Sequence, residues 1–185
     1  AIARAAREAG AQVTLVAGPV HLPTPRGVVR HDVQSAQDMH ARIVELVDQA
    51  TVFVATAAVA DWRPSTSAEH KIKKDGSGQT PHLDFVENTD ILTEVAHSPR
   101  ALSGALFCVG FAAESHDLAG HARLKRERKG VPLLVGNLGP QTFGQDDNAL
   151  LLVDAHGSRE LPRATKLELA RSLVADIANR LKPNH

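Results

Sequence analysis

Several charged residues stand where they could hold a ligand that carries phosphate. Asp61 follows the apolar run from Thr51 to Ala58, and its carboxylate suits a ribose hydroxyl or a Mg²⁺ ion. Lys125 and Lys129 are four residues apart, so a helix places both ammonium groups on one face, where they suit two oxygens of a polyphosphate. Each pattern also has an ordinary structural explanation, because Asp61 could cap a turn and a basic helix end complements the helix dipole.

Three further stretches could contact a ligand: one with an aromatic side chain, one with backbone N–H donors, and one with a lysine on a mobile segment. Gly110 follows an apolar run and could let a ligand approach the backbone. Phe111 comes next and presents a flat face, although a core position is the commoner role for such a residue. Residues 87–90 (ENTD) precede a short helix expected from Ile91, whose first N–H groups could bind a ligand or simply be capped. Lys71 stands in the segment KIKK on an expected hairpin, where a lysine could close over a phosphorylated substrate or only protect a sheet edge.

The apolar pattern predicts the scaffold that must position these residues. Short apolar runs predict strands, and amphipathic stretches predict helices, one of them capped by Ser35. Their alternation indicates an α/β, Rossmann-like, mostly parallel sheet with helices on both faces, and ligands bind such sheets at the carboxyl ends of the strands. The expected strands are 13–17, 28–33, 51–58, 106–112, 133–135 and 149–153, and the expected helices are 1–9, 36–50, 117–129 and 164–181.

We expect residues 1–185 to form a single domain. Within it, one segment has a different pattern of polar and apolar residues from the rest. Residues 71–74 and 82–86 alternate polar and apolar side chains around Asp75-Gly76-Ser77-Gly78, which predicts an antiparallel hairpin within a lid of about residues 66–88. The first helix, 1–9, has neither a cap nor a strand before it. We therefore expect the start of the natural domain to be missing from this sequence.

Composition excludes several classes of protein. Of the 185 residues, 21 are Lys or Arg and 21 are Asp or Glu, so the formal charge is zero and a general nucleic-acid binder is disfavoured. No apolar run approaches the roughly 20 residues that span a bilayer. The single cysteine, Cys108, cannot form an internal disulfide and predicts a reducing, cytoplasmic location. The P-loop, G-x-G-x-x-G, G-x-S-x-G and H-E-x-x-H motifs are absent from the sequence, and the histidines lack metal-ligand spacing.

The order of these signals along the chain resembles one family, the phosphopantothenate–cysteine ligase domain of bacterial coenzyme A biosynthesis. The matching stretches cover nearly the whole chain, and their order is more specific than any one of them. They are GAQVTLVAGPVHLPTP, FVATAAVADWRP, HKIKK, ENTDIL, VGFAAES, ARLKRERKG, LLVGN, FGQDDNALLLVD and TKLELA. Thr89 and Gly136 depart from the family's usual Pro and Ala. The resemblance also implies that an N-terminal strand and an Asn/Gly-rich loop, which supplies the family's Asn for the acyl intermediate, are missing from this sequence.

The resemblance implies a ligase that uses CTP and Mg²⁺ in two steps. The carboxylate of 4′-phosphopantothenate would attack the α-phosphate of CTP, and the amine of cysteine would then displace CMP from the acyl-cytidylate. Lys71 would be the catalytic lysine, Ala58 would border the acyl phosphate, and Asp61 would contact the nucleotide or its metal. The residues implied at the nucleotide are Ala55, Thr56, Ala57, Asp61, Lys71, Val86, Glu87, Asn88, Thr89, Phe111, Lys125 and Lys129.

The resemblance also implies partners, while two other functions stay open. It implies a homodimer with shared active sites and, in many relatives, a fused flavin-dependent decarboxylase. One alternative is a non-catalytic nucleotide-binding or dimerisation fragment, which the absent loop favours. The other is a Rossmann-type NAD(P) dehydrogenase, which the lack of a G-x-G-x-x-G fingerprint disfavours.

Overall fold

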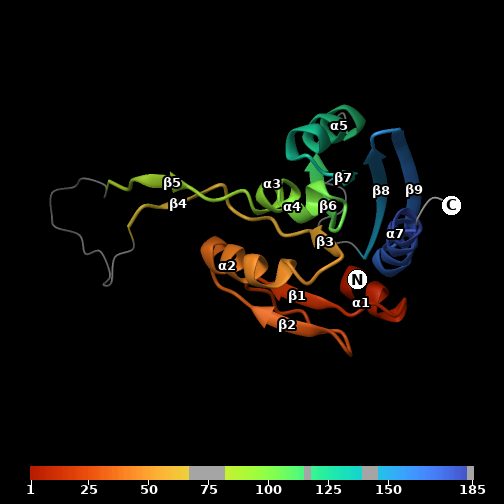
Figure 1. Ribbon diagram of the computed structural model, residues 1–185, viewed down its shortest axis with the longest axis horizontal. Coiled ribbons are helices and arrows are strands. Elements are labelled where there is room, and N and C mark those ends of the chain that lie inside the picture. Colours follow the sequence, from red (N-terminus) through yellow and green to blue (C-terminus); the bar gives the residue numbers. More distant parts are fainter. Residues whose placement is uncertain (67–81, 115–117, 139–145, 183–185) are drawn as a thin grey trace.

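A five-stranded sheet organises most of the chain in the computed structural model, which describes residues 1–66, 82–114, 118–138 and 146–182 (Figure 1). Its strand order is β3-β6-β7-β8-β9. The parallel strands are β3 (Val52–Ala55), β6 (Phe107–Glu114) and β7 (Leu133–Leu138), and β8 (Asp147–Asp154) and β9 (Gly157–Thr165) continue the sheet antiparallel. The sheet is therefore mixed and mostly parallel on its β3 side, which confirms the expected fold class.

Helices cover both faces of this sheet because its central strands are apolar on both sides. On one face, α3 (Ile91–Ala96), α4 (Pro99–Leu102) and α5 (Leu118–Lys129) lie over a cluster that includes Cys108 and Leu134. On the other face, α7 (Lys166–Arg180) packs against a second cluster that includes Val109 and Leu133. Alternate residues of β6 and β7 thus enter different clusters, as the twofold periodicity of a strand requires.

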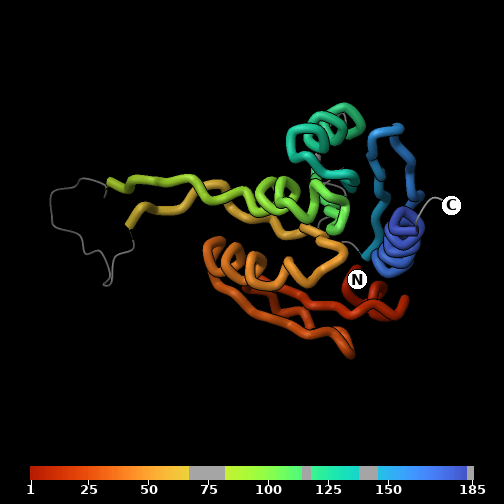
Figure 2. Tube along the Cα trace, in the orientation of Figure 1, coloured from red at the N-terminus to blue at the C-terminus, as the bar shows by residue number. Residues whose placement is uncertain are grey.

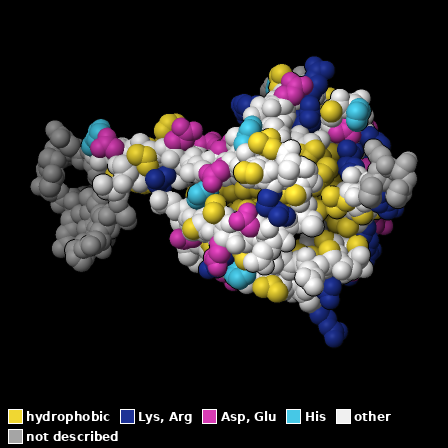
Figure 3. Space-filling view, viewed as in Figure 1, with side chains coloured by type: hydrophobic (Ala, Val, Ile, Leu, Met, Phe, Trp, Pro, Cys, Tyr) yellow, Lys and Arg dark blue, Asp and Glu magenta, His cyan; other side chains and the backbone are white. Residues whose placement is uncertain are grey.

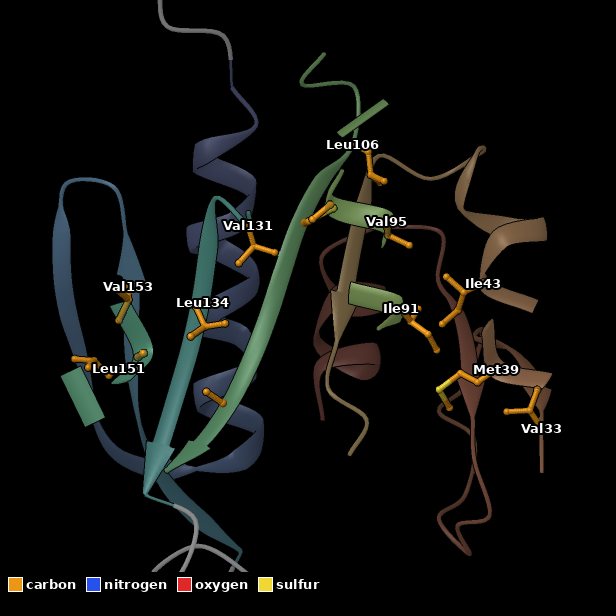
Figure 4. Packing of buried hydrophobic residues seen from close by; sticks show 14 residues of the cluster. Val33, Met39, Ile43, Ile91, Val95, Leu106, Val131, Leu134, Leu151 and Val153 are labelled. Carbon is orange, nitrogen blue, oxygen red and sulfur yellow. The ribbon is translucent and has the colours of Figure 1, made fainter. Parts of the chain in front are cut away.

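A second, two-stranded parallel sheet carries the N-terminal part of the chain. It pairs β1 (Thr14–Ala17) with β2 (Val29–Asp32), and α2 (Ala36–Val47) follows, begun by a capping box between Ser35 and Asp38. Met39 and Ile43 of α2 point toward Ile91 of α3 in the first cluster (Figure 4). Within the described residues β1 pairs only with β2 and β3 only with β6, so the parallel strands form two sheets.

A narrow ribbon leaves the body of the molecule from between α2 and α3 (Figure 1). It pairs β4 (Trp62–Pro64) with β5 (Phe85–Glu87) antiparallel, so the expected hairpin has its base here. Residues 71–74, expected as one of its strands, lie outside the described residues, and its other strand begins at Phe85 rather than at residue 82. Apolar side chains are exposed along this ribbon (Figure 3), and those more than a third exposed are Trp62, Leu83, Phe85 and Val86.

Several element boundaries differ from the expected ones. The strand expected through Ala58 ends at Ala55, and the last helix begins at Lys166 because Thr165 and Glu168 form its capping box. The short helix α4 and the whole of β9 were not expected from the sequence. The first helix, α1 (Ile2–Glu8), lies beside α7 (Figure 2), where the Arg171 Nε atom donates to the Glu8 carboxylate at 2.8 Å. Among the described residues, none of the helices combines the length and apolarity needed to cross a bilayer.

Candidate functional site

Asn88 is a buried polar residue, 9% exposed, that joins two segments of backbone. Its Nδ2 atom donates to the carbonyl of Ala60 at 2.9 Å, and its backbone N–H donates to the carbonyl of Asp61 at 2.8 Å. Its Oδ1 atom accepts from Arg63 Nη1 at 3.0 Å. These bonds fix the loop that follows β3 against the segment that precedes α3, and we call residues 60–63 with 87–89 the Asn88 junction.

Arg63 of the junction also holds the two strands of the ribbon together at their base. The same Nη1 atom that reaches Asn88 also donates to the carbonyl of Glu87 at 2.9 Å. Because a guanidinium holds its donors in a rigid plane, the two bonds fix the orientation of the side chain. Small and polar residues follow β3 in the sequence. The bonds from Arg63 and Asn88 satisfy backbone carbonyls of this region that have no partner in a sheet.

Asp90 ends the same segment and performs two tasks. Its Oδ1 atom accepts from the Thr93 N–H and so caps α3, while its Oδ2 atom accepts from the ammonium of Lys129 on α5. Partial burial raises the pKa of Asp90, but the hydrogen bonds from Lys129 and Thr93 outweigh burial, so its pKa lies below the ordinary value. Asp90 is therefore ionised and paired with Lys129, which was expected from the sequence to bind the nucleotide.

The nucleotide-site residues expected from the sequence fall into groups. The loop from Thr56 to Asp61 and the segment from Val86 to Thr89 are brought together through the bonds of Asn88. Lys129 joins them through Asp90. In exposure, Ala55 and Lys125 are half-buried, and Thr56, Ala57, Ala58, Asp61, Val86, Glu87 and Thr89 are exposed. Lys71 lies outside the described residues.

Phe111 and its neighbour Gly110 have packing roles in the structure. Phe111 is partly buried and packs against the second cluster, which contains Leu169 and Leu173 of α7, on the face away from α3. A Cβ atom on Gly110 would lie 2.8 Å from side-chain atoms of Leu92 and Leu134. The glycine therefore allows α3 to pack closely on β6, rather than the close ligand approach expected from the sequence.

A cavity of about 290 Å³ opens beside the Asn88 junction. Six residues line it: Ala36, Gln37, His40, Arg63, Asn88 and Thr89. His40 Nε2 lies 3.0 Å from both carboxylate oxygens of Glu94 on α3, which brings α2 and α3 together at the cavity. Of the lining residues, the sequence did not single out Gln37, His40 or Arg63, because α2 and the ribbon are far apart along the chain.

The described residues hold no group of three or more His, Cys, Asp or Glu side chains that could bind a metal. A magnesium ion in a phosphate site is commonly held by one or two carboxylates together with the phosphates of the substrate. Asp61 alone would then suffice, since its side chain is exposed and has no hydrogen bond among the described residues. The residues present thus fit a magnesium ion that arrives with a nucleotide.

The chain belongs to the family described as the DNA/pantothenate metabolism flavoprotein C-terminal domain, which matches residues 1–181. Among its relatives, the coenzyme A biosynthesis bifunctional protein CoaBC of Vibrio cholerae is 44% identical over 177 residues, which are 94% of this chain and 44% of the relative. The CoaBC of Escherichia coli K12 is 42% identical over 188 residues, 97% of this chain and 45% of the relative. The chain therefore spans less than half the length of these proteins.

Solved structures agree with this membership. A crystal structure of the C-terminal domain of CoaBC matches with a TM-score of 0.80 and 29% identity, over 99% of this chain and 81% of that one. A Cab2 H337A mutant in complex with phosphopantothenate-cysteine matches with a TM-score of 0.62 and 16% identity, over 83% of this chain and 53% of that one, and shares the fold. The family resemblance drawn from the sequence is confirmed.

Proposed function

We propose that this chain is the ligase part of a protein of coenzyme A biosynthesis, joining 4′-phosphopantothenate to L-cysteine with CTP through an acyl-cytidylate. Family membership and relatives named CoaBC support the pathway. The observation that carries the ligand site is the Asn88 junction, which unites two motif segments after β3 and before α3. Membership in this family also favours a ligase over an NAD(P) dehydrogenase.

In the first step, a carboxylate oxygen of 4′-phosphopantothenate attacks the α-phosphorus of CTP and pyrophosphate leaves. Both reactants are anionic, so cations that offset their repulsion stabilise the transition state. We assign this task to Lys71, Lys125 and Lys129, and we assign Asp61 to the nucleotide and the Mg²⁺ that accompanies it. A bound Mg²⁺ would supply charge neutralisation at the phosphates.

In the second step, the amine of cysteine attacks the acyl carbon and CMP leaves as the amide forms. The loop of Ala55, Thr56, Ala57 and Ala58 would border the acyl phosphate through its backbone. Its attachment at Ala60 and Asp61 to Asn88 supports this role, because a loop fixed in the free protein needs no ordering when the intermediate forms.

The exposed apolar ribbon supports a homodimer as the working state. Trp62 and Phe85 are 59% and 56% exposed on a narrow projection, and burying them against a second copy would stabilise the pair. A fused flavin-dependent decarboxylase is the further partner we propose, since the relatives are bifunctional proteins. Light scattering of the complete protein at micromolar concentration should give twice the protomer mass, and a monomer would contradict the dimer.

Product formation by the complete protein tests the proposed activity. With CTP, Mg²⁺, 4′-phosphopantothenate and cysteine, mass spectrometry should detect 4′-phosphopantothenoylcysteine, with one pyrophosphate and one CMP released per amide. Omitting cysteine should leave acyl-cytidylate bound to the protein. A protein that binds CTP but forms neither compound would instead be the non-catalytic nucleotide-binding fragment.

Nucleotide choice is a separate proposal within this function. We propose that CTP with Mg²⁺ binds more tightly than ATP, with backbone groups around Asn88 reading the edge of the base. A direct competition experiment should show CTP displacing ATP at equal concentration, and equal or tighter binding of ATP would contradict the choice of CTP.

A further inference from the structure

The cavity beside the Asn88 junction brings together more hydrogen-bond donors than the protein itself uses. Arg63 has five N–H donors, and among the described residues only its Nη1 atom has partners, the Glu87 carbonyl and Asn88 Oδ1. The donors on Nε and Nη2 thus have no partner among the described residues, and they belong to a half-buried side chain that lines the cavity. A permanently charged guanidinium with unused donors is suited to bind an anion.

The first turn of α2 adds backbone donors on another side of the cavity. Ser35 Oγ accepts from the Asp38 N–H at 3.1 Å, and the Met39 N–H donates to the Ser35 carbonyl at 3.0 Å. The N–H groups of Ala36 and Gln37, two residues that line the cavity, have no partner among the described residues. The positive end of a twelve-residue helix thus lies beside the same cavity as Arg63.

Two carboxylates of the helices beside the cavity, Glu94 of α3 and Asp38 of α2, already have partners. Both oxygens of Glu94 lie 3.0 Å from His40 Nε2. The Asp38 carboxylate accepts from the Ser35 N–H at 3.0 Å and lines a different depression, with Asp32 and Arg42. Arg63 is consequently the permanent charge that lines the cavity itself.

We propose that this cavity binds a terminal phosphate group, either of a phosphate monoester or of free phosphate. The candidate donors are those of Arg63, the N–H groups of Ala36 and Gln37, and the hydroxyl of Thr89. They are more than the two oxygens of a carboxylate need, and they suit the three terminal oxygens of a phosphate monoester. At about 290 Å³ the cavity lies at the small end of the range for ligand pockets, so it suits one anionic group rather than a whole nucleotide.

Two sources could supply this group: the phosphate of the acid substrate or free phosphate. The first source rests on the proposed function, because the cavity shares Asn88 and Thr89 with the proposed nucleotide site. The phosphate site itself does not rest on that function, since it is argued from Arg63 and α2. Titration with 4′-phosphopantothenate, pantothenate and inorganic phosphate distinguishes the two sources.

The sharpest variant is Gln37→Glu in the complete protein. Gln37 is exposed in the first turn of α2, where an acidic residue is favourable to the helix, so the fold is retained while an anion in the cavity is repelled. Gln49→Glu, just past the end of the same helix, is the matched control with the same change of charge. Arg63→Gln is the second variant, with its thermal unfolding measured alongside.

Isothermal titration with inorganic phosphate should show an affinity that falls about tenfold or more in Gln37→Glu and in folded Arg63→Gln, and by less than about twofold in Gln49→Glu. A parallel loss for 4′-phosphopantothenate, with pantothenate unaffected, would assign the site to the acid substrate. A loss for inorganic phosphate alone would assign it to free phosphate. Equal affinity of Gln37→Glu and the unaltered protein for both phosphates would overturn the site. If the variants lose phosphate affinity as expected but the unaltered protein forms no ligase product, only the proposed function would be refuted.

Discussion

The Asn88 junction and the C-terminal unit, formed by β8, β9 and α7, use similar charged residues in different ways. In the C-terminal unit three aspartates are paired with arginines: Arg163 contacts Asp147 at 2.7 Å, and Arg180 contacts both Asp154 and Asp176. At the junction, Asp61 has no side-chain partner among the described residues, and Arg63 uses only one of its nitrogen atoms.

The two regions also differ in apolar packing, which is tighter around α7 than at the junction. Leu173 of α7 is 0% exposed and lies in a cluster with Leu133, Val135 and Ile177. The junction contains one buried polar residue, Asn88, beneath an exposed loop. The comparison teaches that the C-terminal unit supplies stability, whereas the junction keeps polar groups for a ligand.

The largest effect we expect is on stability, from Leu173→Ala. Truncating a fully buried leucine leaves a cavity, so the free energy of unfolding should fall by about 2–5 kcal/mol in urea titrations. Leu102→Ala is the control, because Leu102 is 72% exposed, and it should change stability by less than about 1 kcal/mol. Nucleotide affinity of the folded Leu173→Ala protein should be unchanged, and a large loss of affinity would break the division between the two regions.

Next in size is the effect of Lys71→Ala on catalysis in the complete protein. If Lys71 stabilises charge on the α-phosphate, kcat should fall by roughly 10²-fold, the scale seen when one preorganised donor is lost. The assay should follow acyl-cytidylate formation without cysteine, because we assign Lys71 to the first step. Lys71→Gln keeps hydrogen bonding without charge and should be equally slow. A normal rate in Lys71→Ala would return this residue to the role of an edge lysine that changes stability by less than about 0.5 kcal/mol.

A smaller effect is expected from Asp90→Asn. Asparagine caps helices as well as aspartate, so α3 should be retained, while the negative charge that holds Lys129 is removed. The phosphates of a nucleotide would no longer compete with this carboxylate, and CTP should bind roughly two- to fivefold more tightly by titration calorimetry. Asp90→Asn combined with Lys129→Ala should lose this gain. Weaker binding in the single variant would show that Asp90 positions Lys129 for the nucleotide.

The smallest effect concerns Glu8, which ties α1 to α7. Hydrogen bonds from Arg171 and then Arg4 lower the pKa of Glu8 from 4.5 to about 2. Because the folded-state pKa is the lower one, the stabilisation is present above about pH 4.5 and is lost as the pH falls toward 2. Glu8→Gln should flatten the dependence of unfolding free energy on pH within this window, and Glu160→Gln on β9 should not. Because Glu8 lies at the surface, 0.5 M salt should reduce the difference.

The sequence predicted those elements whose local signals agree with their tertiary setting. Ser35 and the apolar stripe through Met39 and Ile43 predicted α2, and Asp90 and Ile91 correctly marked the start of α3. Strand β9 was missed because it contains Pro162 and three charged residues. An edge strand tolerates these residues, but in sequence they resemble a loop.

The candidate site was predictable only as separate pieces. Motifs marked Asp61, Asn88 and Lys129, but the bonds that join them pass through backbone carbonyls and through Asp90, which a motif does not display. The cavity residues Gln37 and Arg63 come together only when α2 and the ribbon are packed, so their proximity has no local sequence signal. Gly110 was interpreted as room for a ligand because a glycine in a strand does not reveal which group approaches it.

Hydrogen–deuterium exchange of the complete protein, with and without CTP and Mg²⁺, tests the central claim most directly. The account predicts that CTP slows exchange in the loop 55–61, in residues 86–92 and in the second half of α5, and leaves β8, β9 and α7 unchanged. Protection confined to the C-terminal unit, with the Asn88 junction exchanging at its former rate, would contradict it.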